Sequence, residues 1–488
     1  MFRSALGAVA VLMALSLAGP VTLAEGSQAP LLHVHRDGSV SVASDSLPTD
    51  LPVGPSNSVL QPSTIQRDVA TPAASAAVPY TIRRMLSAKH ITQAQATAAL
   101  TAWTKAVRTR RTLSGLPREE LGNVIAIVTG ITNRKSFTPS RINSITLLLQ
   151  RNTEFFGAKR VPAYHQRVQF DGSDIVWQYY PGQGMQIQVL ATFGVANGLW
   201  RVHLNGHFRA LLDEMNSLAS YRAGGKAWEY MFNFDGGSPP WTSAMSQATG
   251  IQAMARGAQR LQDPKYLKAA RDSLTIFKRS TPSGVLSSTG KGPWYVMYSF
   301  DGSGRIFNGF LQTLIGLHEL VIKANDPTAR RLFNSAEPVA RRVIPNYMSS
   351  GWSFYEPGEW SSESYHELTT GFLGELCTRT GKKAYCTAKD KFAAETANPP
   401  RLAVATKALK AGKPAALRFW VSKPASVTVT VKAGRRTLRS VSGSYEPGFH
   451  RLSGVNPPKR ASALAVVVNG SDPAGKKRRI VSTIKVKR

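Results

Sequence analysis

Tyrosines are the residues of this sequence whose type and spacing most suggest chemistry. Tyr298, Tyr355 and Tyr365 lie in segments rich in aromatic residues, glycine and serine. A phenol can give or take a proton in catalysis, but its unperturbed pKa is about 10, so the phenolate is scarce at neutral pH. A lysine or arginine nearby would lower that pKa by favouring the charged form. Each tyrosine also has a structural interpretation, since an aromatic ring at the mouth of a helical hairpin often only packs a cleft wall.

Other chemistries find little support in the sequence. It contains no phosphate-binding loop and no nucleotide-binding fingerprint. Its nine histidines form no cluster that we recognise as a metal site. We therefore predict neither a catalytic metal nor a cofactor.

Four short segments carry a family resemblance. They are Pro240–Gln247 (PWTSAMSQ), Trp294–Tyr298 (WYVMY, followed by Asn308-Gly309-Phe310), Ser350–Tyr355 (SGWSFY) and Tyr365–Leu368 (YHEL). In order and spacing they resemble the P-W-x-S-A-M-x-Q, W-Y-E-E-Y, S-G-x-S/T-x-Y and Y-H-x-x-H elements of the C-terminal domain of D-glucuronyl C5-epimerases. The resemblance covers residues 228–396, about a third of the chain. Enzymes of this family invert C5 of a uronic acid within a polysaccharide.

The resemblance implies a set of site residues. Inversion at C5 needs a base on one face of the sugar, an acid on the other and donors that stabilise the enediolate. The catalytic tyrosines of the family would be Tyr298, Tyr355 and Tyr365. We expect substrate contacts from Tyr179 and Tyr180 in the loop 178–184, and from Trp294, Gln247, Arg305, Asn308 and His366. His366 is otherwise a core histidine or an orienter of a tyrosine.

Two departures from the family pattern affect this expectation. Met297 stands where the family has a glutamate, and Gly358 stands where it has an arginine. Arg305, Glu356 or Glu359 could replace the missing groups; the alternatives are a different substrate or a loss of activity. Two other functions therefore stay open. One is a polysaccharide lyase, which needs a Tyr or His base, or a hydrolase, which needs two carboxylates; Asp235, Glu356, Glu359 and Glu363 are the available candidates. The other is a catalytically degenerate protein that binds acidic glycan.

Helical periodicity dominates the middle of the chain. We predict four hairpins: Leu190–Leu204 with Phe208–Tyr221, Ser243–Leu261 with Pro264–Lys278, Arg305–Ala324 with Pro327–Arg342, and Glu363–Thr378 with Lys382–Glu395. Asp263-Pro264 and Asp326-Pro327 each supply an N-cap followed by a first-turn proline. The predicted fold is mainly α, an (α/α) toroid over residues 185–398. A helical region with an aromatic and glycine-rich loop precedes it over 81–184.

The two ends of the chain differ from this middle part. Residues 1–24 read as a secretory signal peptide, and 25–80 as a disordered linker. Beyond Pro399-Pro400, short β-branched runs predict a small accessory β-sandwich over 400–488. Cys377 and Cys386 could form a disulfide between two helices in an oxidising compartment, or remain free thiols. These features predict a secreted or cell-envelope protein.

Charge suggests the kind of partner. The net charge is +32, and residues 401–488 contain twenty Lys or Arg against two acidic residues, a net of +18. Such a surface attracts polyanions, although a basic surface can also simply be solvated. We expect an acidic polysaccharide as the substrate and a second anionic polymer of the cell envelope bound by the C-terminal domain. Export argues against nucleic acid as a partner, and the family resemblance implies a homodimer.

Overall fold

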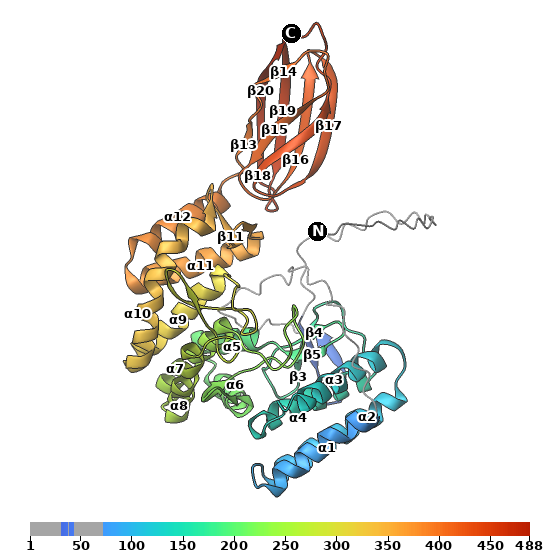
Figure 1. Cartoon of the computed structure of the whole chain (residues 1–488), viewed down its shortest axis with the longest axis vertical. Helices are drawn as coiled ribbons and strands as arrows, with labels where there is room; N and C mark the ends of the chain where they lie inside the picture. Colours follow the sequence, from blue (N-terminus) through green and yellow to red (C-terminus); the bar gives the residue numbers. More distant parts are fainter. Residues whose placement is uncertain (1–30, 38, 43–71) are drawn as a thin grey trace, which may run out of the picture.

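The computed structural model describes residues 31–37, 39–42 and 72–488 (Figure 1). The signal-peptide prediction lies outside these residues, as does most of the predicted linker. Inside the predicted linker, β1 (Leu32–Val34) pairs in parallel with β3 (Arg167–Phe170) and antiparallel with β2 (Val40–Val42). The prediction of disorder is therefore wrong for these strands, because their backbone groups are paired and Val34 is fully buried.

The N-terminal region combines four helices with one sheet. Helix α1 (Pro72–Ser87) already begins within the predicted linker and packs with α2 (Gln93–Thr112) and α3 (Gly115–Asn133), and α4 (Ile142–Gly157) packs on these two helices. The sheet has the order β2-β1-β3-β4-β5 and ends in a hairpin of β4 (Trp177–Tyr180) and β5 (Gly184–Ile187). The loop 178–184 of the sequence prediction is thus largely a β-hairpin.

Glu120 of α3 fixes this hairpin to the helices. Its buried carboxylate accepts hydrogen bonds from the Tyr179 hydroxyl at 2.8 Å and from the N–H groups of Gly182 at 2.7 Å and Gly184 at 3.0 Å. Gly184 has φ +72°, and an added Cβ would lie 2.4 Å from Val124. Because neighbouring side chains of a strand point to opposite faces, anchoring Tyr179 directs Tyr180 away from the helices.

The four predicted helical hairpins are confirmed. They pair α5 with α6, α7 with α8, α9 with α10, and α11 with α12. Asp263 caps α8 by accepting from the Lys265 N–H, and Asp326 caps α10 by accepting from the N–H groups of Thr328 and Ala329. Their bounds are α5 Val189–Arg201, α6 Asn205–Leu218, α7 Ala244–Leu261, α8 Pro264–Ser273, α9 Phe307–Ala324, α10 Pro327–Val343, α11 Glu363–Thr380 and α12 Lys383–Ala397.

The first helices of the hairpins pack in chain order, α5 on α7, α7 on α9 and α9 on α11 (Figure 1). Gly316 of α9 allows the closest approach, since a Cβ there would lie 2.1 Å from the Ala248 carbonyl oxygen of α7. Helices α5 and α11 are the two ends of this arc, and both line one polar cavity of about 300 Å³. These contacts establish a mainly helical array, but not the closed toroid that the sequence predicted.

A short β-hairpin precedes each of these four helices. The hairpins are β4–β5 before α5, β6 (Ser220–Arg222) with β7 (Gly225–Ala227) before α7, β8 (Leu286–Thr289) with β9 (Gly292–Tyr295) before α9, and β11 (Trp352–Glu356) with β12 (Glu359–Trp360) before α11. Because an antiparallel helix separates consecutive members, the four helices run in one direction. The connections that carry these hairpins therefore meet at one end of the array.

A disulfide joins the last pair of helices. Cys377 of α11 and Cys386 of α12 are bonded, with their Cα atoms 4.9 Å apart. The sequence had left free thiols as an alternative, and the structure decides in favour of the bond. Among the described residues, no helix is both long enough and apolar enough to cross a membrane.

The C-terminal region is a β-domain of two sheets around one apolar core. One sheet has the order β13-β15-β18 and the other β14-β20-β19-β16-β17. Lys423 holds the domain to α12: its buried ammonium donates to the carbonyls of Glu395 and Asn398 and pairs with Asp472 at 2.5 Å. The strands are β13 Leu402–Val404, β14 Ala408–Lys410, β15 Ala415–Val421, β16 Ala425–Ala433, β17 Arg436–Tyr445, β18 Gly448–Val455, β19 Ala463–Ser471 and β20 Lys477–Lys487.

Candidate functional site

The structure brings the three predicted catalytic tyrosines together where the connecting segments meet. The rings of Tyr355, on β11, and Tyr365, in the first turn of α11, have centroids 4.9 Å apart. Tyr298 precedes α9, and its phenol is hydrogen-bonded to that of Tyr355. All three side chains are only partly buried, so part of each remains accessible to a ligand.

Local structure explains how Tyr355 and Tyr365 come to face each other. Ser362 caps α11 by accepting a hydrogen bond from the Tyr365 N–H. His366, the next residue, accepts the Ser353 N–H at Nδ1 with a length of 3.0 Å, and its ring stacks on Trp352 at 3.9 Å. The histidine thus ties the start of α11 to β11. Burial lowers the pKa of His366 to about 4, so it is neutral and acts as an acceptor.

Two further tyrosines complete the cluster. Tyr180 reaches it from β4 and interacts electrostatically with Tyr365, Tyr298 and Tyr230. The Tyr230 hydroxyl lies 2.7 Å from the Ser246 hydroxyl and accepts the Leu190 N–H at 3.3 Å. We call Tyr180, Tyr230, Tyr298, Tyr355 and Tyr365 the phenol cluster.

Sequence reasoning missed Tyr230, although a signal was available. Aromatic residues occupy every second position at Trp228, Tyr230, Phe232 and Phe234. A period of two places residues on one face of an extended chain, and the rings from 230 to 234 do contact in succession, at 5.9 and 6.1 Å. Trp241 stacks on Tyr230 at 4.2 Å and meets Tyr298 edge-on at 5.8 Å. This aromatic wall holds the phenols in place.

The electrostatics of the cluster differ from those predicted. We expected a basic cleft that lowers a phenol pKa, but burial raises the pKa of Tyr298, Tyr355 and Tyr365. The Glu359 carboxylate raises that of Tyr365 further. Burial also raises the pKa of Tyr180 to about 12, against the opposing charge of Arg167. The five tyrosines are therefore protonated at neutral pH in the free protein.

Arg167 is a cation that the sequence analysis did not single out. It lies on β3 beside Tyr180, and its Nε donates to the Gln178 side chain at 3.1 Å. His165 packs its ring against Tyr180 at 5.7 Å. Both belong to the N-terminal region, so the site draws on two parts of the chain.

The remaining predicted substrate contacts are placed less favourably for that role. Gln247 is fully buried and uses both ends of its amide on the backbone of Trp228. Trp294 is buried against Phe310, with ring centroids 4.0 Å apart. Tyr179 is engaged by Glu120, as described above. These three residues have structural partners that account for their positions.

Asn308 and Arg305 lie at the start of α9 and just before it. Asn308 is buried, and within the described part of the chain its Oδ1 has no hydrogen-bond partner. The Arg305 guanidinium donates to the carbonyls of Gly302 and Gly304 and lies over Trp294. Its backbone N–H is bound by Glu356. Arg305 therefore orders the loop before α9.

The structure also locates the two departures from the family pattern. Met297 contacts the start of α9, where its methyl carbon would lie 3.1 Å from a Cβ on Gly309. Gly358 sits in the β11–β12 turn with φ +89°, a conformation that an arginine adopts only with strain. Glu356 and Glu359 flank this turn and act on the cluster, raising the pKa values of Tyr355 and Tyr365 respectively. Carboxylates are thus present near the phenols, supplied by other positions.

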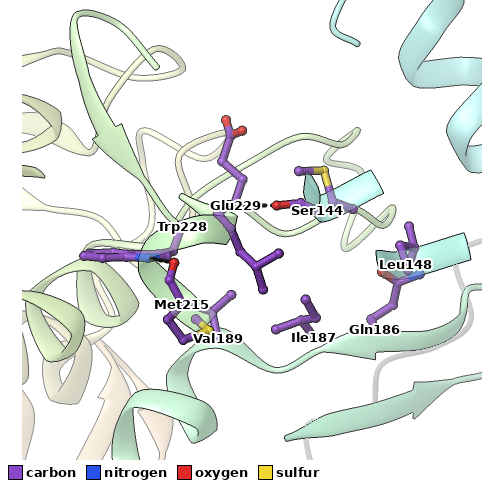
Figure 2. Close-up of a pocket in the computed structure, with 10 residues that line it drawn as sticks. Ser144, Leu148, Gln186, Ile187, Val189, Met215, Trp228 and Glu229 are labelled. Carbon is purple, nitrogen blue, oxygen red and sulfur yellow. Dashed lines mark hydrogen bonds between the residues drawn. The ribbon is translucent and has the colours of Figure 1, made fainter. Parts of the chain in front are cut away.

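A small cavity has none of the five phenols in its lining. It measures about 20 Å³, room for about one water molecule, and its lining includes Met215, Trp228 and Glu229 (Figure 2). The Trp228 indole donates to the Met215 carbonyl at 2.9 Å. Glu229 is paired with Arg141 at 2.6 Å and Arg222 at 2.8 Å. These contacts join the N-terminal helices to the hairpin array and have a structural role.

Metal-binding groups are also dispersed. His33 and His35 are two residues apart, and His203 and His207 are four apart, which are spacings seen in metal sites. Among the described residues, however, no group of three or more His, Cys, Asp or Glu side chains is placed to hold a metal ion.

Comparison with known proteins places the phenol cluster in a family context. Residues 224–394 match the family described as D-glucuronyl C5-epimerase C-terminus. Over 131 residues the chain is 33% identical to a D-glucuronyl C5-epimerase of Caenorhabditis elegans; this covers 24% of the chain and 21% of that protein. The matched part thus spans about a fifth of the length of this curated relative.

Solved structures give only weak likenesses. An endo-beta-1,4-glucanase from Acetobacter xylinum has a TM-score of 0.31 at 9% identity, over 42% of this chain and 72% of that one. An endoglucanase from Komagataeibacter sucrofermentans has a TM-score of 0.29 at 8% identity, over 40% and 70%. Neither bears on the argument. The sequence match does: residues 224–394 are similar to the D-glucuronyl C5-epimerase C-terminal family, whose members are carbohydrate epimerases and hence isomerases.

Proposed function

We propose that this chain is an exported isomerase that inverts C5 of hexuronic acid residues within an acidic polysaccharide. The observation that carries the proposal is the meeting of Tyr298, Tyr355 and Tyr365 in one cluster. They come from three separate segments, and each coincides with a catalytic tyrosine position of the family. We further propose that α5, α7, α9 and α11 form the inner wall of an (α/α) toroid, with the substrate entering at the end that carries the phenols.

Tyr298 is the proposed base. Burial raises its pKa, but the hydrogen bond from Tyr355 opposes that rise because it stabilises the phenolate. In this scheme the Tyr298 phenolate takes the proton from C5, and Tyr365 returns a proton to the opposite face. The protonated phenols around them donate hydrogen bonds to the enediolate.

Such a cycle leaves Tyr298 protonated and Tyr365 ionised, so a proton must return before the next turnover. Tyr355 is hydrogen-bonded to Tyr298, and its ring lies against Tyr365. It is the residue placed to carry that proton. The scheme thus gives Tyr355 two roles, activation of the base and restoration of the acid.

Deuterium exchange tests the proposal. The full chain is incubated in D2O with non-sulfated and sulfated polyuronates, and loss of the C5 proton is followed by NMR. We expect exchange with the native protein and at least about a 100-fold lower rate with Tyr298→Phe, which lacks the proposed base. Tyr221→Phe, an exposed tyrosine on β6, serves as the matched control. The ring signals of the product separate an epimer from the unsaturated product of a lyase.

A second candidate function is binding of acidic glycan without turnover. It is favoured by the raised pKa of every phenol in the cluster and by Met297 in place of the family glutamate. In that case no polymer exchanges its C5 proton, while salt-sensitive binding remains. The NMR experiment decides between the two functions.

A further inference from the structure

The outer face of the larger β-domain sheet has an unusual composition. Alternate residues of β16 and β19, such as Val427, Val429, Val466 and Val468, face the core. The residues between them face outward and pair across the strands in rows. One row contains Ser444, Ser426, Ser471 and Lys477, and the next contains Ser442, Thr428, Asn469 and Arg479.

These two rows line an open groove of about 860 Å³. The two rows supply hydroxyl and amide groups to its floor, with Gly443, Val427 and Gly470 between them, and the Thr428 and Ser442 hydroxyls lie 2.8 Å apart. No aromatic residue is among the described residues that line it. Such a surface offers hydrogen bonds to sugar hydroxyls but no stacking platform for the bases of a single-stranded nucleic acid.

Basic side chains follow one border of the groove. Lys477 and Arg479 occupy alternate positions of β20 and line the groove, and Lys485, six residues further along the strand and outside the groove lining, projects from the same face of the sheet. All three are exposed, and within the described part of the chain none forms an ion pair. The domain carries a net charge of +18, so little negative charge is available to neutralise them.

The groove has a fixed position relative to the rest of the molecule. Lys423 binds the last carbonyls of α12, and Lys476, next to Lys477, donates to the Thr396 carbonyl at 2.7 Å. The β-domain that carries the groove thus adjoins the α12 end of the helical array (Figure 1).

We propose that this groove binds a polyuronate chain, with Lys477 and Arg479 pairing with carboxylates and the Ser, Thr and Asn side chains binding sugar hydroxyls. The identification of the ligand as a polyuronate rests on the proposed function, whereas the evidence for a binding surface comes from the β-domain alone. The groove would hold a long substrate and raise its local concentration at the phenol cluster.

Binding of a fluorescently labelled polyglucuronate of about 20 sugars tests the proposal. The full chain carries Tyr365→Phe, so that failure of the proposed catalysis has no influence on the result. We expect the added pair Lys477→Ser and Arg479→Ser to weaken binding about tenfold at moderate salt. The matched control is Arg418→Ser with Arg451→Ser. These two exposed residues are cross-strand neighbours on β15 and β18 in the other sheet, so the double substitution removes the same amount of positive charge. The control should change affinity by less than about threefold.

Equal weakening by both pairs would overturn the proposal, because net charge alone would then explain binding. A second result would also overturn it: a single-stranded oligonucleotide of matched charge that binds as tightly as the polyglucuronate and loses its binding in the same groove variant. Circular dichroism establishes that the variants are folded. If the groove variant is not folded, the double variant Lys477→Gln with Arg479→Gln replaces it. We expect that variant to lose polyglucuronate affinity to the same extent.

Discussion

Tyr355 and Tyr365 lie ring to ring, with centroids 4.9 Å apart, although one belongs to a strand and the other to a helix. Their separation is set by His366, which follows Tyr365 and binds the Ser353 N–H two residues before Tyr355. A buried neutral histidine thus fixes the geometry of two phenols that both precede it in the chain, without itself being one of the reacting groups.

His366 makes stability depend on acid pH. Its pKa is lowered from 6.5 to about 4 by burial, so the folded state binds fewer protons than the unfolded state between these values. The contribution of neutral His366 to the free energy of unfolding is complete above about pH 6.5 and is lost as pH falls through 4. The loss amounts to at most about 3 kcal/mol. Urea unfolding at several pH values should show this loss. The loss should be absent in His366→Gln, and an unchanged acid slope in that variant would contradict the assignment.

Tyr355→Phe should change the pH profile of C5 exchange. The substitution removes the hydrogen bond that lowers the pKa of Tyr298, so less phenolate forms at neutral pH. We expect exchange at pH 7 to fall about 10- to 100-fold and the profile to move to higher pH. Tyr221→Phe should leave the profile in place. A uniform loss at all pH values would point to a role in packing instead.

The phenol cluster should make the fold sensitive to alkali. Burial raises the pKa of Tyr180 to about 12, against about 10 in an unfolded chain. Its stabilising contribution is complete below pH 10 and is lost as pH rises toward 12, with a slope of up to about 1.4 kcal/mol per pH unit. Unfolding free energies measured across this range should fall less steeply in Tyr180→Phe. Phenolate absorbance recorded in parallel should show fewer late-titrating tyrosines in the variant.

Gly184→Ala tests the anchoring of the β4–β5 hairpin. The residue has φ +72°, and a Cβ would meet Val124 at 2.4 Å, so we expect a loss of about 2–4 kcal/mol in the free energy of unfolding. Gly371→Ala is the matched control. Gly371 is exposed in the middle of α11, and a Cβ there would meet nothing within 4 Å. It should be neutral or stabilise by about 0.5–1 kcal/mol. Similar effects at both sites would argue against a strained, closely packed Gly184.

Loss of the Cys377–Cys386 disulfide should loosen the last hairpin. The two cysteines are nine residues apart, so the loop they close is short and the bond contributes about 2–3 kcal/mol in the chain-entropy account. The variant Cys377→Ala with Cys386→Ala should unfold at a lower urea concentration. Reduction of the native protein should reproduce the shift, and reduction of the variant should have no further effect.

Sequence alone determined the periodic parts of this protein. The 3.6-residue pattern and the Asp-Pro caps located all four hairpins to within a few residues, since both act within one or two turns of helix. The family motifs also identified three of the five tyrosines of the phenol cluster. The short strands within residues 25–80 escaped prediction because their stability comes from pairing with β3, more than a hundred residues away.

Tertiary structure decided the character of the site. Whether a phenol pKa rises or falls depends on what surrounds it, and here burial and carboxylates act where the sequence suggested cations. Tyr179 and Tyr180 are adjacent in sequence, yet one binds Glu120 and the other joins the cluster, because a strand directs neighbouring side chains to opposite faces. Arg167 and the basic groove likewise depend on contacts between distant segments, which no local pattern of residues contains. For Tyr230 the alternating aromatic residues gave a local signal, but only the fold shows that this ring joins the cluster.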